Sequence, residues 1–174
     1  MFILFRNRTV SMNTDEALKK LLRSFEHYYD IKLENAVPPF AAEAEFHQHQ
    51  EQYILVRAAH VSDVDSNEYV FFYTCASLSK ENLAETAEKA WKEGLSRVKV
   101  YPGHRNSDVI LIILADKIDE DALKQVKKIK YYKSYAFSFR GWSHFKLVAM
   151  ETFSKKLASN RLGKDLKKLF KTIN

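Results

Sequence analysis

Apolar residues recur along this chain at two spacings, which predict helices in some segments and strands in others. A spacing of three or four positions places apolar side chains on one face of a helix. Four segments follow it: residues 14–29, the stretch from the Ser79 cap to about Trp91 or Glu93 with Gly94 as the stop, the stretch from the Asp119 cap to Ile129, and residues 161–172. The sequence therefore predicts about four helices, the first and last of them strongly amphipathic.

Strand signals occur in blocks between these helices. They are the alternating residues 42–49, the β-rich runs 53–60 and 68–76, a short option at 97–101, the apolar run 109–115, and the aromatic-rich runs 135–140 and 143–151. The run from Val109 to Ala115 is continuously apolar, which predicts a central strand covered on both faces. The order α-β-β-β-α-(β)-β-α-β-β-α predicts an α+β fold with a mixed, largely antiparallel sheet flanked by about four helices, the first three strands forming a meander.

Length and composition favour a single domain. The chain has 174 residues, and no linker or repeat divides it. Met12 directly precedes a helix start at Asn13, so we interpret residues 1–11 as an extension or a misread start and residues 12–174 as the domain. The longest apolar run is too short to span a bilayer, and one cysteine, Cys75, with no secretion signal favours the cytoplasm.

Three short motifs in the C-terminal part resemble those of a known family. They are Lys133-Ser134-Tyr135, Phe139-Arg140-Gly141-Trp142 and Asn160-Arg161-Leu162-Gly163-Lys164. With them, residues 109–170 resemble a family of bacterial domains of unknown function. The resemblance supports the domain boundaries and implies no mechanism, since the family has no established activity.

Charge is distributed unevenly along the chain. Residues 117–174 hold 15 Lys and Arg against 5 Asp and Glu, whereas residues 1–116 hold 13 against 17. A basic third predicts an anionic partner such as nucleic acid, because Lys and Arg release counterions from phosphates. The predicted anion-binding residues are Lys127, Lys128, Lys130, Lys133, Arg140, Arg161, Lys164, Lys167, Lys168 and Lys171. Tyr132 and Trp142 are predicted to stack on bases.

Other interpretations of the same features stay open. The lysines of the last helix are also what the solvated face of a helix docked on a sheet looks like, and a basic amphipathic helix can lie at a membrane interface. A protein partner or a homo-oligomer is a further alternative. The preferred function is a non-catalytic binding or accessory module that faces a polyanion.

An enzyme of unrecognised type is the alternative function. His104, in a loop before the central strand, is its catalytic candidate, and Glu45, His47 and His49 share one strand face that could hold a metal. The glycines are too far apart for a phosphate loop, so no nucleotide cofactor is expected. The element order is similar to that of restriction-endonuclease-like nucleases, but the third strand lacks the acid-x-Lys motif of an active member.

Overall fold

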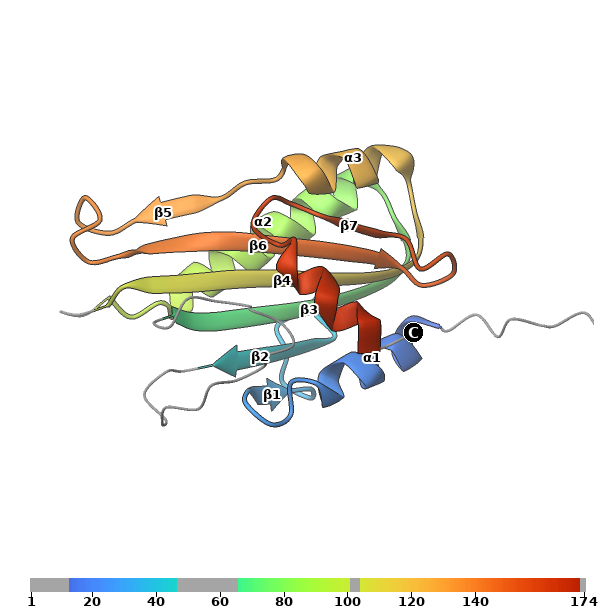
Figure 1. Cartoon of the computed structure of the whole chain (residues 1–174), viewed down its shortest axis with the longest axis horizontal. Helices are drawn as coiled ribbons and strands as arrows, with labels where there is room; N and C mark the ends of the chain where they lie inside the picture. Colours follow the sequence, from blue (N-terminus) through green and yellow to red (C-terminus); the bar gives the residue numbers. More distant parts are fainter. Residues whose placement is uncertain (1–12, 47–65, 101–103, 173–174) are drawn as a thin grey trace, which may run out of the picture.

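One mixed sheet organises the protein (Figure 1). The computed structural model describes residues 13–46, 66–100 and 104–172. Within these residues the chain order is α1 (Thr14–Arg23), β1 (Asp30–Lys32), β2 (Ala42–Phe46), β3 (Ser66–Leu78), α2 (Lys80–Arg97), β4 (Asn106–Ile118), α3 (Glu120–Lys128), β5 (Tyr132–Ser134), β6 (Trp142–Glu151), β7 (Leu157–Ser159) and the 3-10 helix η1 (Asp165–Thr172). The described strands lie in the order β1-β2-β3-β4-β6-β5, with β7 also paired to β6. The predicted α+β class and mixed sheet are confirmed.

Strand directions divide the sheet into a parallel centre and antiparallel margins. β3, β4 and β6 are parallel neighbours, and α2 and α3 make the crossovers between them. β1, β2 and β3 form an antiparallel meander, and β5 and β7 pair antiparallel to β6. β1 is a strand that periodicity did not predict, and the predicted strand 53–60 lies outside the described residues. The predicted strand at 42–49 is confirmed over residues 42–46, and its remainder lies outside the described residues.

The first helix is shorter than its apolar spacing predicts. α1 ends at Arg23, and its N-cap is Asn13, whose Oδ1 accepts a hydrogen bond from Glu16 N at 2.8 Å. Backbone turns after Arg23 bring Phe25 into the core, where it packs edge-on against Phe72 at 5.2 Å between ring centroids. The apolar spacing from residue 24 to 29 therefore arises from side chains that are buried in turns, and it does not indicate a helix there.

α2 is longer than predicted, because Gly94 does not end it. The helix runs to Arg97 with Gly94 buried inside it. A Cβ at Gly94 would lie 2.5 Å from Val109 Cγ2, so glycine allows the helix to approach the central strand. The predicted strand at 97–101 is wrong over its described part, since Arg97 ends the helix and residues 98–100 form no strand.

The predicted strand at 135–140 is also wrong. β5 ends at Ser134, and residues 135–141 form the loop between β5 and β6. Ala136, Phe137 and Ser138 have positive φ angles there, which no strand residue adopts. β6 begins at Trp142, one residue before the predicted start.

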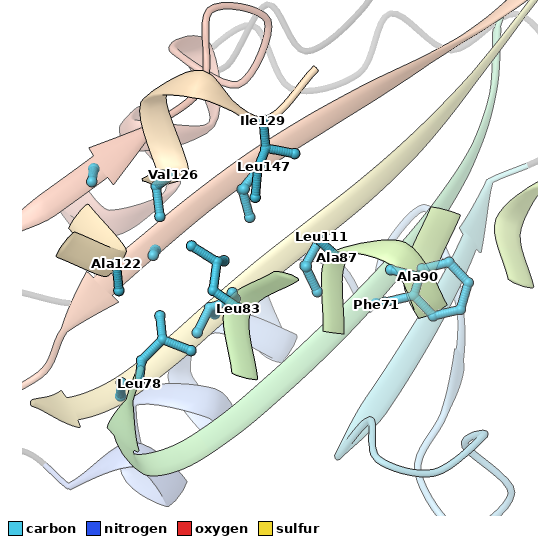
Figure 2. Close-up of a cluster of buried hydrophobic side chains, with 14 of the residues drawn as sticks. Phe71, Leu78, Leu83, Ala87, Ala90, Leu111, Ala122, Val126, Ile129 and Leu147 are labelled. Carbon is cyan, nitrogen blue, oxygen red and sulfur yellow. The ribbon is translucent and has the colours of Figure 1, made fainter. Parts of the chain in front are cut away.

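Two hydrophobic cores cover the two faces of the sheet. Figure 2 shows Leu83 and Ala87 of α2 and Val126 of α3 facing Leu111 and Leu147 of the sheet. The second core places α1 and η1 on the opposite face. The run from Val109 to Ala115 is at most 1 % exposed, which confirms the predicted central strand. No helix of the described residues is long and apolar enough to cross a membrane.

Candidate functional site

The Asn160 side chain connects two basic segments of the chain to β6. Its Nδ2 donates to Ile129 O at 3.2 Å and to Phe145 O at 2.9 Å. Its Oδ1 accepts from Leu147 N at 3.1 Å and from Gly163 N at 2.8 Å. The side chain is 3 % exposed, so these four bonds form away from water. They fix the segment after α3 and the segment after β7 against β6.

Basic residues flank both ends of this connection. Lys128 and Lys130 stand on either side of Ile129, and Arg161 and Lys164 follow Asn160. All four side chains are exposed. The structure thus brings together cations that are more than thirty positions apart in the sequence, on the side of β6 where β5 and β7 pair with it. We call this side of the sheet the β6 edge. The ammonium and guanidinium groups of these cations can bind an anion that spans this edge.

The remaining predicted anion-binding residues lie on α3, on the β5–β6 hairpin and on η1. Lys127, Lys133, Arg140, Lys168 and Lys171 are exposed, and Lys167 is half-buried. Among the ten predicted cations, the ion pairs of the described residues include only Lys168, which lies 3.7 Å from Asp165. The other nine have no acidic partner in the described part of the chain.

η1 presents its lysines by docking its apolar side on the sheet. Leu166 and Phe170 are buried against the core that contains Val148 and Met150. Leu162, which falls within the predicted helix 161–172, precedes η1 and is 37 % exposed. The helix is 3-10 rather than α, but its division into a docked and a solvated side agrees with the apolar spacing.

The two predicted stacking residues flank one histidine. The centroid of the Tyr132 ring lies 5.5 Å from that of His144, and the centroid of the Trp142 ring lies 6.2 Å from it. Tyr132 is 52 % exposed and Trp142 is half-buried. Strand register places Tyr132 directly opposite His144. We call these three side chains the aromatic row.

A buried charged cluster lies beside the aromatic row and shares His144 with it. Glu68, Asp108 and His144 are direct neighbours across β3, β4 and β6. Lys146 Nζ lies 2.5 Å from Asp108 Oδ2, and the Tyr29 hydroxyl donates to Glu68. Glu68 and Asp108 are at most 2 % exposed. No sequence pattern indicates this cluster, because its members lie on three strands and in the turns before β1.

The surroundings of the cluster shift two of its proton equilibria. Burial, reinforced by the Glu68 carboxylate, raises the pKa of the Tyr29 hydroxyl well above its ordinary value. Burial lowers the pKa of His144; Lys146 acts in the same direction and the Asp108 charge opposes it. Both groups are therefore uncharged near neutral pH, and Tyr29 acts as a hydrogen-bond donor.

His104, the catalytic candidate, is 4 % exposed and holds a loop. Its Nδ1 lies 2.8 Å from Arg140 O, and its Nε2 lies 2.9 Å from Ser107 Oγ. A carbonyl only accepts, so Nδ1 donates to Arg140 O, and in the neutral ring Nε2 then accepts from the Ser107 hydroxyl. The bonds connect the start of β4 to the β5–β6 loop, and they give His104 a structural explanation.

The predicted metal face is only partly described. Glu45 Oε1 lies 3.0 Å from Lys32 Nζ and 2.7 Å from Arg97 Nη1, so cations occupy that carboxylate. Burial opposes its ionisation, but Lys32 and Arg97 outweigh burial and lower the pKa of Glu45. His47 and His49 lie outside the described residues. The described ranges contain no group of three or more His, Cys, Asp or Glu placed to hold a metal ion.

The thiol of Cys75 is half-buried. Burial, with the nearby Asp116 charge, raises its pKa to about 11. The group is therefore protonated near neutral pH and is a poor nucleophile.

Comparison with known families places the whole described region in one of them. The family described as a domain of unknown function (DUF8052) matches residues 13–172. The chain belongs to the DUF8052 family. No curated protein and no solved structure matches it. The match begins at the N-cap of α1 and ends with η1, so the DUF8052 domain comprises every helix and strand described above.

Some members of the site could be found in the sequence of this DUF8052 domain and others could not. The lysines and the two stacking residues carry a compositional signal. Asp108 carried a weaker one, since it is a charged residue directly before the apolar run 109–115. Glu68 and Lys146 stand in strands of ordinary alternation, and only the register shows that they converge.

Proposed function

We propose that this DUF8052 domain is a non-catalytic nucleic-acid-binding module of the cytoplasm, with the β6 edge as its binding surface. The observation that carries the proposal is the junction at Asn160, whose hydrogen bonds hold the backbone of two basic segments next to each other. Nucleic acid is the polyanion proposed because its phosphates repeat at a spacing that an extended row of cations can neutralise.

Within the described residues, the cations at this edge lack carboxylate partners, and this supports the proposal. Exposed Lys and Arg side chains near one another repel, and nearby carboxylates usually relieve that repulsion. At Lys128, Lys130, Arg161 and Lys164 the described residues supply no carboxylate partner. An anion that binds across this edge relieves the repulsion and gains from the release of its own counterions.

The aromatic row supports a nucleic acid over other polyanions. The aromatic row places the rings of Tyr132, His144 and Trp142 near the β6 edge. Stacking on such rings is a common way for proteins to hold bases. Lys133 adds a charge to this part of the hairpin, where its Nζ lies 5.5 Å from the centroid of the Tyr135 ring.

The test is binding of labelled DNA and RNA oligonucleotides as a function of salt. For the wild type we expect log affinity to fall linearly with log salt, by about 0.9 per phosphate contact on duplex DNA. The variant Lys128→Gln/Lys130→Gln/Arg161→Gln/Lys164→Gln removes the four edge cations, all of them exposed. It is expected to bind more weakly, and its shallower salt slope should correspond to about three to four fewer phosphate contacts.

A matched control carries the same substitution on α2 and just after it. Lys80, Lys89, Lys92 and Lys99 are exposed, and α2 covers the face of the sheet opposite to η1. Their fourfold change to Gln lowers the net charge equally and is expected to leave the salt slope unchanged. Equal losses of affinity in both variants would mean that net charge alone attracts the nucleic acid. If the wild type does not bind at about 50 mM salt, the proposal is refuted.

A further inference from the structure

Two phenylalanines project into solvent from the loop between β5 and β6. Phe137 is 95 % exposed and Phe139 is 91 % exposed, the highest fractions among the exposed large hydrophobic side chains. Figure 1 shows this loop at the end of the sheet opposite the β6–β7 turn. Phenylalanine is usually buried, so two nearly fully exposed rings in one short loop indicate a contact surface.

The conformation of this loop is held by hydrogen bonds within it. Tyr135 N donates to Gly141 O at 2.9 Å, and Arg140 N donates to Tyr135 O at 3.2 Å. Phe139 N donates to Ala136 O at 3.0 Å. The exposed rings therefore stand on an ordered backbone rather than on an open strand end.

Contacts with the rest of the fold anchor the same loop. His104 Nδ1 donates to Arg140 O, and the Tyr135 hydroxyl lies 2.8 Å from Ser143 Oγ. A Cβ at Gly141 would lie 1.8 Å from Arg105 O, so this close approach requires glycine. These contacts fix both ends of the loop and leave the two phenylalanines outside.

The backbone of the loop is unfavourable for the residues that form it. Ala136, Phe137 and Ser138 have φ angles of 47°, 52° and 71°, a region in which side chains with a Cβ are uncommon. Strained backbone of this kind clusters at binding sites, where the surrounding structure maintains it. Here the strain turns the chain so that both phenylalanines point away from the body.

The charge of the surrounding chain indicates an anionic partner. No acidic residue occurs between Asp121 and Glu151. Lys133, in β5 just before the loop, and Arg140, within the loop after both phenylalanines, are exposed. The loop therefore offers two apolar rings between two cations.

The apolar residues of this hairpin are almost all aromatic, which indicates bases as the partner. Between Tyr131 and Phe145 the only aliphatic side chain is that of Ala136. Burial in a lipid bilayer rewards aliphatic and aromatic area alike, whereas stacking on a base requires a ring. Bases within a duplex are already stacked and paired, so only unpaired bases can lie on these rings without that cost.

We propose that Phe137 and Phe139 stack on unpaired bases, so that the nucleic acid bound by this domain is single-stranded. The inference rests on the proposed function and specifies its ligand. In it, the β6 edge binds the phosphates and the loop 135–141 binds bases of the same strand.

The test compares ligands with and without bases. The probes are an oligo(dT) of about 12 nucleotides and an abasic strand of the same length, which keeps the phosphates. The wild type is expected to bind oligo(dT) at least about tenfold more tightly than the abasic strand. The variant Phe137→Leu/Phe139→Leu keeps apolar side chains and removes the rings; it is expected to lose most of that difference and to keep its affinity for the abasic strand.

Two further variants control for folding and for ring chemistry. Phe137→Trp/Phe139→Trp retains rings and is expected to retain the preference for oligo(dT). Phe153→Leu changes an exposed phenylalanine that is 76 % exposed just beyond the other end of β6, and it is expected to change neither affinity. Thermal unfolding of every variant checks that the fold is intact, because the changed side chains contribute little to the core.

Three other outcomes would contradict the stacking inference. Equal binding of oligo(dT) and the abasic strand, with no effect of the leucine variant, would overturn the stacking inference and leave the proposed function in place. Binding to vesicles with about 30% phosphatidylserine but to no oligonucleotide, kept by the leucine variant and lost in Phe137→Ser/Phe139→Ser, would overturn both and assign the loop to a membrane. Binding to neither probe would also overturn both.

Discussion

Lys146 faces Asp108 across two parallel strands, with its Nζ 2.5 Å from Asp108 Oδ2. The Asp108 side chain is 2 % exposed and that of Lys146 is 13 % exposed, so water screens this pair little. Within the part of the chain that the structure describes, Asp108 Oδ1 has no hydrogen-bond partner, and His144 Nδ1 lies 3.9 Å from it. The pair joins β4 to β6 where the parallel centre meets the aromatic row.

Removing the lysine is expected to destabilise the fold strongly. Lys146→Met leaves the Asp108 carboxylate buried without its cation, which costs about 3–5 kcal/mol for a buried pair. The double variant Asp108→Asn/Lys146→Met removes both charges and is expected to recover part of that loss. Urea unfolding at neutral pH measures both, and equal losses in the single and double variants would show that the charge pair is not the cause.

Asn160 is expected to be a structural requirement of the basic edge. Asn160→Ala leaves four buried backbone groups without their partner, so we expect a loss of at least about 3 kcal/mol. Asn160→Asp retains the acceptor for Leu147 N and Gly163 N but turns an oxygen toward the carbonyls of Ile129 and Phe145, and it is also expected to be destabilised. Denaturant unfolding tests this, with Ser154→Ala as the exposed control. A loss below about 1 kcal/mol for both Asn160 variants would contradict the assignment.

Stability is expected to depend on pH through His144. Its pKa is lowered in the fold by burial, so at acidic pH the unfolded chain binds a proton more readily than the folded one. This contribution is fully present above the unfolded pKa of about 6.5 and is lost as pH falls through the folded pKa. In His144→Gln the slope of unfolding free energy between about pH 7 and pH 5 should be smaller. An unchanged slope would assign the pH dependence to other groups.

Residues 1–11 are expected to contribute little to the domain. α1 begins at Thr14, and Asn13 supplies its N-terminal hydrogen bond, so the helix keeps its cap when the preceding residues are deleted. A chain that starts at Met12 should melt within about 2 °C of the full chain. A decrease of several degrees would show that residues 1–11 pack on the core and belong to the domain.

The loop 135–141 shows why local preference was misleading. Its aromatic residues favour strands when each is considered with its neighbours, so the sequence predicted a strand at 135–140. The fold instead requires a turn there, because β5 must reverse within a few residues to pair with β6. In the sequence, the glycine at position 141 is the residue of this loop whose type indicates a turn. In the fold, Gly141 has a positive φ angle and lies against Arg105 O.

Gly94 shows the same limit for helices. Glycine after an apolar stripe is a common helix stop, and periodicity alone therefore ended the second helix there. In the fold Gly94 is the contact point with Val109, so the helix continues to Arg97. Arg97 then reaches Glu43 at 2.7 Å, an ion pair that the shorter predicted helix does not contain.

The sequence by itself determined the features that depend on neighbouring residues. The apolar run from Val109 to Ala115 needs cover on both faces wherever it lies, and the amphipathic spacing after Gly163 needs a surface on which to dock. The tertiary structure alone decided which distant side chains meet: Asp108 with Lys146, and Asn160 with Ile129. The reason is physical, because a strand's period of two and a helix's period of 3.6 are local, whereas the register between strands is set by the packing of the whole sheet.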